Sequence, residues 1–276
     1  MDRIRLIASD MDATLLDEQS QLPADFEETI HALAELGIRF APASGRPLYT
    51  LEAMFPTLQD ELVFIGDNGG AIRWKGQNLF TSEMSPEGWR ALNRLTREQG
   101  DIAVLCGLES AYVERPFAVH DAVLRHFYTK IEYVDRLEDV TAPADKFTIY
   151  LPQHNAQQAY DTVYASQRSI YSVAVAGECW VDIMNPGVHK GAALQTLGQL
   201  WGLPSESIMA FGDTYNDAEM LRTAKYGFLM ENGSEPLRQK VPFLAPSHRE
   251  AGVMQVLHRV LAQNGCVCPE DFVPAH

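Results

Sequence analysis

The sequence predicts an α/β protein with a Rossmann-like parallel sheet core, helices on both faces of that sheet, and an inserted α+β module. Near both ends of the chain, short apolar runs alternate with helical patterns, which is typical of a parallel sheet covered on two faces. In the middle of the chain this alternation gives way to hairpins. We therefore expect a core domain at residues 1–84 and 186–276 and an inserted domain at residues 85–185.

The strands of the core are expected where short apolar runs could be buried on both sides. These runs are Arg3–Ser9, Ile38–Ala43, Leu62–Ile65, Ser207–Phe211 and Tyr226–Met230. A helix over Ala24–Leu36 joins the first two, because its apolar residues recur at helical spacing and Gly37 can end it. Further core helices are expected at His189–Trp201, Asn216–Arg222, Pro236–Lys240 and Glu250–Ala262.

The inserted module follows a hairpin, Ala71–Trp74 with Leu79–Thr81, that turns near Gly76. Ser85-Pro86-Glu87 then opens a helix, because proline is favoured in a first helical turn. The elements expected here are helices at Pro86–Gln99, Ala118–Lys130 and Ala156–Gln167, strands at Ile102–Cys106, Ala111–Glu114 and Lys146–Leu151, and a hairpin of Tyr171–Ala176 with Glu178–Ile183. Roughly the last dozen residues of the chain carry no pattern, and we expect them to be loose.

The composition excludes several classes of partner. The chain has 22 Lys and Arg against 37 Asp and Glu, a formal net charge of −15, which repels nucleic acid and anionic membranes. No apolar stretch approaches the ~20 residues that span a bilayer, and nothing resembles a signal segment. With only four cysteines, a reducing, cytoplasmic location is expected. A monomer or homodimer acting on a small anionic molecule, which needs a local cation, fits these features.

Small and polar residues follow the first four core strands. Each alone is an ordinary loop residue. Together they matter, because ligands of an open parallel sheet bind outside the carboxyl ends of its strands. We therefore predict a site built from the residues at these ends: Asp10 and Asp12, then Ser44, Gly45 and Arg46, then Asp67-Asn68-Gly69, and finally Asp213, Asn216 and Asp217.

These residues carry a family resemblance. The stretch DMDATLL, which begins at Asp10, resembles the DxDGT signature of the haloacid dehalogenase-like phosphatases. Ser44, Lys190 and the run Gly212–Asp217 resemble the second, third and fourth motifs of that superfamily, in the same order. The inserted module between Ser44 and Lys190, with DNGG and NPGVHKGAAL, is similar to the Cof-type branch and its large α/β cap. The resemblance covers nearly the whole chain.

The resemblance implies a mechanism in which a carboxylate attacks the phosphorus atom. Asp10 would be the nucleophile that forms an aspartyl-phosphate, and Asp12 would protonate the leaving group and then activate the hydrolytic water. Mg²⁺ would be held by Asp10, Asp213 and the backbone carbonyl of Asp12, because a hard cation prefers oxygen ligands. Asn216 and Asp217 would lie beside the metal, either as metal ligands or as residues that position the ligands.

The same resemblance implies the phosphate-binding residues. Lys190, at the start of a helix, would pair with the phosphate and with Asp10. Ser44 and Gly45 would donate to phosphate oxygens, although Ser44 can equally cap the following helix. Thr14 would brace the loop or touch the phosphate.

The leaving group has weaker candidate contacts. Arg46 and Asn68 lie nearest the chemistry, while the turn at 176–180, the segment CGLES and the stretch around Arg115 could contribute from the inserted module. One departure from the signature is Ala13 in place of glycine, which is awkward if this position needs a positive φ.

The function implied is a Mg²⁺-dependent phosphatase acting on a small phosphorylated metabolite, either a sugar phosphate or a phosphorylated cofactor precursor. Two alternatives stay open at this point. A phosphosugar mutase would use the same aspartyl-phosphate but return the phosphoryl group to a sugar hydroxyl. A non-catalytic protein that binds a phosphorylated ligand would keep the fold without turnover.

Overall fold

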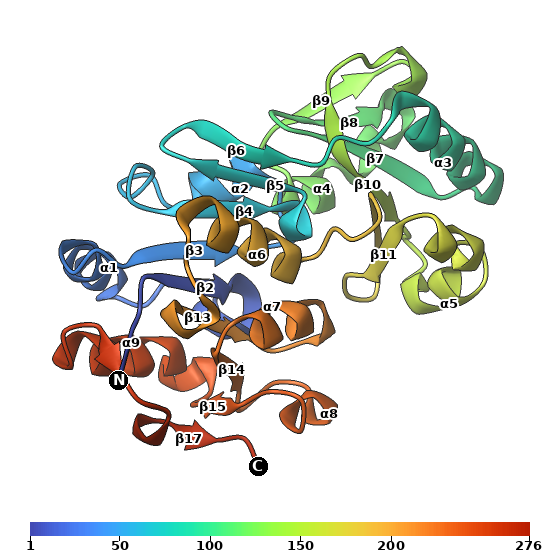
Figure 1. The fold of residues 1–276 in the computed structure, drawn as a ribbon. Helices are drawn as coiled ribbons and strands as arrows, with labels where there is room; N and C mark the ends of the chain where they lie inside the picture. The colour runs from blue at the N-terminus through green and yellow to red at the C-terminus, as the bar shows by residue number, and fades with distance from the viewer.

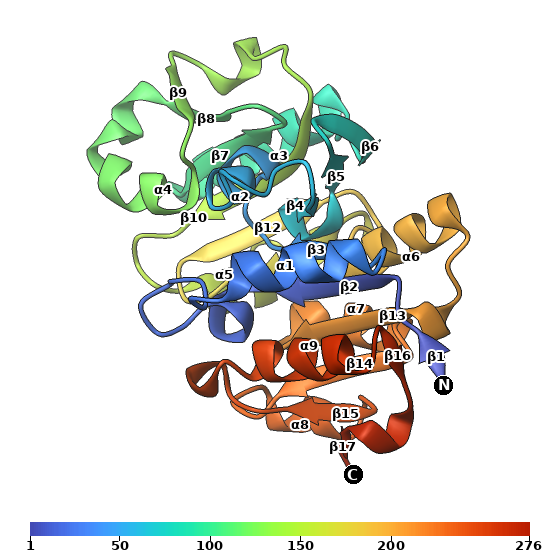
Figure 2. The same cartoon turned by 90° about the vertical axis from the view of Figure 1, so that its left-hand side faces the viewer.

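A nine-stranded sheet forms the main body of the protein in a computed structural model that describes residues 1–276 (Figures 1 and 2). In order across the sheet the strands are β17 (Val273–Pro274), β15 (Phe243–Ala245), β14 (Tyr226–Met230), β13 (Ile208–Gly212), β2 (Leu6–Asp10), β3 (Arg39–Ala43), β4 (Val63–Gly66), β5 (Ala71–Trp74) and β6 (Gln77–Thr81). The strands from β15 to β4 are parallel, whereas β17, β5 and β6 pair antiparallel at the edges.

Helices cover both faces of this sheet (Figures 1 and 2). One face packs against α1 (Phe26–Glu35), α2 (Leu48–Ala53) and α9 (Gly252–Ala262), and the other against α6 (Lys190–Trp201), α7 (Ala218–Thr223) and α8 (Glu235–Arg238). The residues of β2 are all buried, because both faces are covered. The expected α/β core is confirmed. No helix of the structure is both long and apolar enough to cross a membrane.

The inserted α+β module forms a second, six-stranded sheet at the upper right of Figure 1. Its strands, in order, are β11 (Ser172–Val175), β12 (Trp180–Met184), β10 (Ala144–Tyr150), β7 (Ile102–Gly107), β8 (Ala111–Glu114) and β9 (Ile131–Val134). Only β8 and β9 are parallel neighbours. The helices of the module are α3 (Pro86–Gln99), α4 (Asp121–Phe127) and α5 (Ala156–Asp161). This sheet has its own apolar core, which is separate from that of the large sheet.

The two chain ends differ from expectation. The predicted strand Arg3–Ser9 is shorter in the structure, since β2 of the large sheet begins at Leu6. The residues before it form β1 (Asp2–Arg3), which pairs antiparallel with β16 (Cys266–Val267) in a separate ladder. The prediction that the last residues are loose was wrong, since β16 and β17 both pair and Phe272 packs against the rings of Phe228 and Phe243. Strands of two residues show no periodicity, so no sequence pattern could indicate them.

Several predicted helices are shorter in the structure. In place of one helix over 118–130, the structure has a 3-10 helix, Arg115–His120, followed by α4. A single long helix is not stabilised there, because its apolar Val119 and Val123 are exposed rather than packed. The run 156–167 breaks after α5 at Thr162, whose hydroxyl bonds back to the carbonyl of Gln158. Helices α7 and α9 each begin only after a 3-10 turn, at Tyr215–Asp217 and at His248–Glu250, and α8 is confined to Glu235–Arg238. Helix α2 is the helix that the sequence analysis mentioned after Ser44 without giving its bounds.

Candidate active site

The chain turns sharply where β2 ends at Asp10. Asp12 is extended, with φ −73° and ψ 132°, and Ala13 adopts a left-handed conformation with φ 56°. The carbonyl of Ala13 accepts a hydrogen bond of 2.9 Å from the amide of Asn232. Glycine adopts a positive φ freely, whereas an alanine at position 13 carries roughly 1 kcal/mol of backbone strain.

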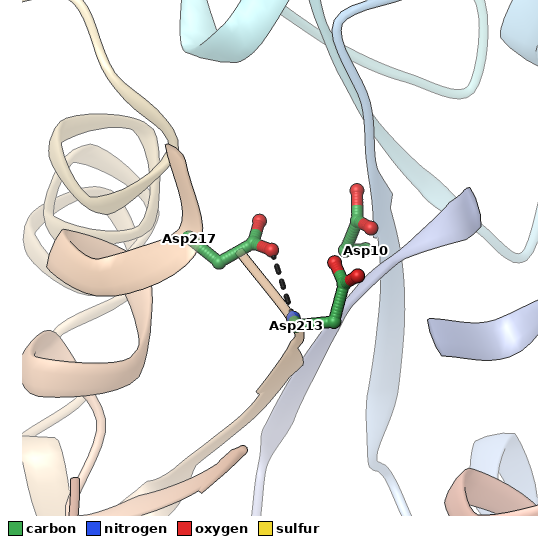
Figure 3. A group of neighbouring side chains, drawn as sticks. All are labelled: Asp10, Asp213 and Asp217. Carbon is green, nitrogen blue, oxygen red and sulfur yellow. Dashed lines mark hydrogen bonds between the residues drawn. The ribbon is translucent and has the colours of Figure 1, made fainter. Parts of the chain in front are cut away.

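An acidic cluster lies at the carboxyl ends of β2 and β13 (Figure 3). One carboxylate oxygen from each of Asp10, Asp213 and Asp217 lies within 4.8 Å of the other two. Asp10 and Asp213 end adjacent parallel strands, whereas Asp217 reaches them from the turn that follows. Asp217 is completely buried and accepts hydrogen bonds from the backbone N–H groups of Asp213 (3.0 Å) and Thr214 (3.3 Å). Its carboxylate thus fixes the loop that carries Asp213.

Lys190 joins two members of this cluster. It is the first residue of α6, and its side chain is completely buried. The ammonium donates to Asp10 and, at 2.7 Å, to Asp217. The preceding residue, His189, caps the helix by accepting a hydrogen bond of 3.1 Å from the N–H of Ala192, a role that the sequence had not indicated. Lys190 is therefore a buried ion-pair partner of the candidate nucleophile.

Two carboxyl groups of the cluster, Asp10 and Asp213, have raised pKa values. Burial, followed by the charge of Asp217, raises the pKa of Asp10 to about 8, although Lys190 opposes this shift. Burial and Asp217 likewise raise the pKa of Asp213 to about 6. One lysine thus leaves excess negative charge among three buried carboxylates. A divalent cation with oxygen ligands, such as Mg²⁺, fits both this charge and this donor set.

The loop Ser44-Gly45-Arg46 follows β3 and is tied to the loop after β4. The N–H of Asn68 donates to the carbonyl of Ser44, and the N–H of Asp67 to that of Arg46, both at 2.9 Å. The Ser44 hydroxyl accepts from the N–H of Arg46 at 3.1 Å. Ser44 does not cap α2, because that helix has Pro47 as its N-cap. The hydroxyl instead stabilises the loop itself.

Arg46 forms a two-pronged ion pair with Asp12. One guanidinium nitrogen lies 3.0 Å from a carboxylate oxygen of Asp12, and the second nitrogen contacts the other oxygen. The Asp12 side chain is 57% exposed, whereas that of Arg46 is 10% exposed. The arginine thus holds an accessible carboxylate on the wall of the site.

A cavity of about 780 Å³ brings most of the predicted site residues together. Its lining includes Asp10, Asp12, Ser44, Gly45, Arg46, Asn68, Asp213 and Asn216. The predicted residues buried outside this lining are Thr14, Asp67, Gly69, Lys190 and Asp217. From the inserted module the lining includes Ala176, Gly177 and Trp180 of the predicted turn, but neither CGLES nor Arg115.

Lys146, which the sequence analysis did not identify as a site residue, lines the cavity from β10 and is 2% exposed. Its ammonium nitrogen lies 2.5 Å from the carbonyl oxygen of Gly45, 3.0 Å from a carboxylate oxygen of Asp67 and 3.6 Å from Asp182. Asp182, on β12, accepts hydrogen bonds from the amide of Asn68 (3.0 Å) and the hydroxyl of Thr148 (2.7 Å). The inserted module is thus joined to the core through buried charges.

Asp145, the neighbour of Lys146, is completely buried as well. Burial, followed by the charge of Asp67, raises the pKa of Asp145 well above its ordinary value, which favours the protonated form of Asp145. The only sequence signal was a pair of charges, Asp145-Lys146, at the start of an apolar strand, and a single charge, Asp182, inside another. A buried charge needs a partner, but the sequence of the strand does not identify which residue that partner is.

Comparison with known proteins identifies a family and several relatives that this chain resembles. A family model described as haloacid dehalogenase-like hydrolase matches residues 7–257. The 5-amino-6-(5-phospho-D-ribitylamino)uracil phosphatase YbjI of Escherichia coli is 32% identical over 262 residues, which cover 94% of this chain and 96% of the relative. The HMP-PP phosphatase of Cronobacter sakazakii is 31% identical over 249 residues, which cover 87% of this chain and 89% of the relative.

Solved structures agree with the fold. A crystal structure of a Streptococcus mutans protein matches with a TM-score of 0.85 and 29% identity, covering 94% of this chain and 99% of that one. A Plasmodium vivax structure described as a putative HAD/COF-like hydrolase matches with a TM-score of 0.84. At 18% identity, and with coverage of 95% of this chain and 97% of that one, it shows the fold alone.

Proposed function

This chain belongs to the haloacid dehalogenase-like hydrolases, in their Cof-type branch, and is a phosphoric monoester hydrolase of that family; we propose that it is a Mg²⁺-dependent phosphatase that acts through an aspartyl-phosphate. The observation that carries the proposal is that Asp10, Asp12 and Asp213 line one cavity together with the loop Ser44-Gly45. A nucleophile, an acid and a set of cation ligands therefore face the same space.

In the first step, a carboxylate oxygen of Asp10 attacks the phosphorus atom, and the bond to the leaving oxygen breaks. Asp12 gives its proton to that oxygen, so the product leaves as an alcohol. Lys190 pairs with Asp10 and orients its carboxylate for attack. The N–H of Gly45 and the hydroxyl of Ser44 would donate to the phosphate oxygens, whereas the N–H of Ser44 is bonded to the carbonyl of Ile65.

In the second step, water attacks the phosphorus atom of the aspartyl-phosphate. The water gives a proton to Asp12, which regains its starting state, and Asp10 is released with inorganic phosphate. Arg46 holds the carboxylate form of Asp12 on the cavity wall, and one prong of this ion pair opens in the proposed mechanism when Asp12 carries the proton. The net reaction is hydrolysis of one phosphate ester bond by one water.

Asp10 and Asp213, with the backbone carbonyl of Asp12, would hold the metal. When bound, Mg²⁺ supplies positive charge that offsets the carboxylates and lets a phosphate dianion approach. Asp217 already accepts two backbone hydrogen bonds and pairs with Lys190. We assign it to positioning Asp213 and Lys190, while the exposed Asn216 lines the cavity beside them.

Residues 85–185 act as a cap in this proposal. Module residues such as Lys146 and Trp180 line the cavity, so the module contacts whatever leaving group is bound. Two relatives are named as phosphatases of a phosphorylated ribitylaminouracil and of HMP-PP. Their names support a phosphorylated cofactor precursor as the substrate, in preference to a plain sugar phosphate.

The test is phosphate release from a panel of sugar phosphates and phosphorylated cofactor precursors, with Mg²⁺ or with EDTA. Asp10→Asn is compared with Asp60→Asn, an exposed aspartate outside the cavity that serves as the matched control. We expect release that needs metal, persists in Asp60→Asn and is lost in folded Asp10→Asn. A rearranged sugar phosphate without free phosphate would reveal a mutase, and a folded, metal-loaded chain that turns nothing over would reveal a binding protein.

A further inference from the structure

We propose that the substrate's leaving group carries a flat aromatic or heteroaromatic ring, which binds against the apolar cap wall of the cavity. This cap wall consists of Phe127, Tyr128, Tyr160, Val173, Val175 and Trp180. The inference rests on the proposed phosphatase function and names the class of substrate for the same site.

The size of the cavity is the first argument. Its volume of about 780 Å³ far exceeds that of a phosphoryl group, and pockets of roughly 300–1,000 Å³ hold drug-sized molecules. The phosphate end is accounted for by Asp10, Ser44 and Asp213. The remaining space therefore belongs to the leaving group, and the cap wall bounds it.

The cap wall presents apolar and aromatic surface. Phe127, Tyr160, Val173 and Val175 are half-buried, so each shows part of its side chain to the cavity. Trp180 is held in place by neighbouring rings, because its ring centroid lies 4.6 Å from that of Tyr150 and 5.1 Å from that of Phe127. Fixed aromatic rings favour another ring at a centroid distance of about 4.5–7 Å.

Four polar side chains on the same side of the cavity are already paired with the protein: Lys146, Thr148, Gln157 and Asp182. Lys146 contacts Gly45 and Asp67, and Thr148 donates to Asp182, which also accepts from Asn68. The side-chain amide of Gln157, which also lines the cavity, donates to Asp161 at 2.9 Å.

This pairing separates two classes of leaving group. A sugar carries a hydroxyl on almost every carbon, and each loses its bonds to water on burial unless it finds a partner. A flat ring needs few polar partners and gains from the apolar surface. The cap wall therefore favours the ring.

The core adds a further ring to the cavity. Tyr215, in the turn that follows β13, lines the cavity and is 57% exposed, which is high for a large aromatic side chain. Exposed aromatic side chains at a cavity are typical of surfaces that contact a bound molecule. A ring-bearing leaving group would find aromatic side chains on both the cap and the core.

The experiment compares benzyl phosphate with cyclohexylmethyl phosphate and with ribose 5-phosphate. All are esters of primary alcohols, so the bond that breaks is of one kind, while the group beside it is a flat ring, a puckered ring of the same size or a sugar. We expect kcat/KM for benzyl phosphate to exceed that for the other two by roughly fivefold or more, the effect of one good aromatic contact.

A pair of variants tests whether the cap wall is responsible. Tyr160→Leu keeps an apolar side chain but removes the ring, whereas Tyr112→Leu changes a half-buried tyrosine of the same module that does not line the cavity. We expect Tyr160→Leu, but not Tyr112→Leu, to lower the ratio of kcat/KM for benzyl phosphate to that for ribose 5-phosphate by roughly fivefold.

Binding is measured separately from turnover, by titrating each phosphate ester into Asp10→Asn and following tryptophan fluorescence. Tighter binding of benzyl phosphate than of ribose 5-phosphate supports the ring site even if no phosphate is released by wild type. The ring site is overturned if ribose 5-phosphate is bound or hydrolysed better than both ring esters, or if the two tyrosine variants behave alike. Release of phosphate without any preference overturns the ring site and leaves the phosphatase proposal standing.

Discussion

The ammonium nitrogen of Lys146 lies 2.5 Å from the carbonyl oxygen of Gly45, so a lysine of the inserted module donates into the loop that carries Ser44. The same nitrogen lies 3.0 Å from Asp67, whose N–H bonds to the carbonyl of Arg46. The proposed phosphate loop is therefore fixed from two sides. The cap contributes to the shape of the phosphate end as well as to the leaving-group end.

Replacing Lys146 with methionine should destabilise the protein and weaken phosphate binding. The change leaves Asp67 and Asp182 buried without their cation, which typically costs about 3–5 kcal/mol. The measurements are the free energy of unfolding in denaturant and inhibition by inorganic phosphate. Lys130→Met, which alters an exposed lysine of the same module, is the control. Equal stability of the two variants would contradict a role for the buried ion cluster.

The two neighbouring candidates Asn216 and Asp217 should differ sharply on substitution. Asp217→Asn removes the second carboxylate partner of Lys190 and weakens the support of Asp213, so we expect activity to fall by about 10- to 100-fold. Asn216→Ala removes an exposed side chain that accepts a hydrogen bond from the Thr214 hydroxyl, and should lower activity much less. Initial rates of phosphate release at saturating Mg²⁺ decide this, and a larger loss in Asn216→Ala would reverse the assignment.

Ala13→Gly should relieve backbone strain with little effect on turnover. The left-handed φ costs alanine roughly 1 kcal/mol, but glycine also gains freedom in the unfolded chain, which offsets part of that amount. We expect the free energy of unfolding to rise by no more than about 1 kcal/mol, and the rate of phosphate release to stay within about threefold. A gain of orders of magnitude in rate would show instead that Ala13 impairs this enzyme.

Asp145 should make the protein less stable at high pH. The pKa of Asp145 in the folded protein lies well above its ordinary value of 3.8, so the folded state binds more protons than the unfolded state between these two values. The free energy of unfolding therefore decreases as pH rises above about 4, by at most about 1.4 kcal/mol per pH unit for one proton.

The variant Asp145→Asn removes that proton while keeping the shape of the neutral acid. We expect its free energy of unfolding to depend less on pH than that of wild type between about pH 5 and 8, measured by denaturant titration at several pH values. Asp161→Asn, an exposed aspartate of the same module, should keep the wild-type slope. Parallel curves for wild type and Asp145→Asn would contradict a buried, protonated Asp145.

The sequence was sufficient to bring Asp10, Ser44 and Asp213 to one edge of the sheet. Each follows an apolar run that is buried on both sides, and the carboxyl ends of parallel strands meet at one edge. The resemblance to a known family added Lys190. Lys190 does not follow a core strand, so sheet topology alone does not indicate that it lies near the other three residues. That Lys190 is completely buried, and paired with Asp217, depends on how α6 packs and could not be predicted from its motif.

Lys146 and Asp182 were missed for a physical reason. Each lies on a strand of the inserted module, and its partners belong to loops of the core or to other strands. A charge in an apolar strand indicates that a partner exists, but its identity is set by how the module docks on the core. The short strands at the chain ends were missed because two residues show no period.

Strand β2 lies between β3 and β13, and this order has a consequence for synthesis on the ribosome. Its partner β3 emerges soon after it, but β13 is made only after the entire cap. Throughout that interval one edge of β2, made of apolar residues, lacks its neighbour and can pair with another nascent chain. A polypeptide that stops before Ile208 keeps this edge open permanently, and such truncated products should aggregate although their cap module is complete.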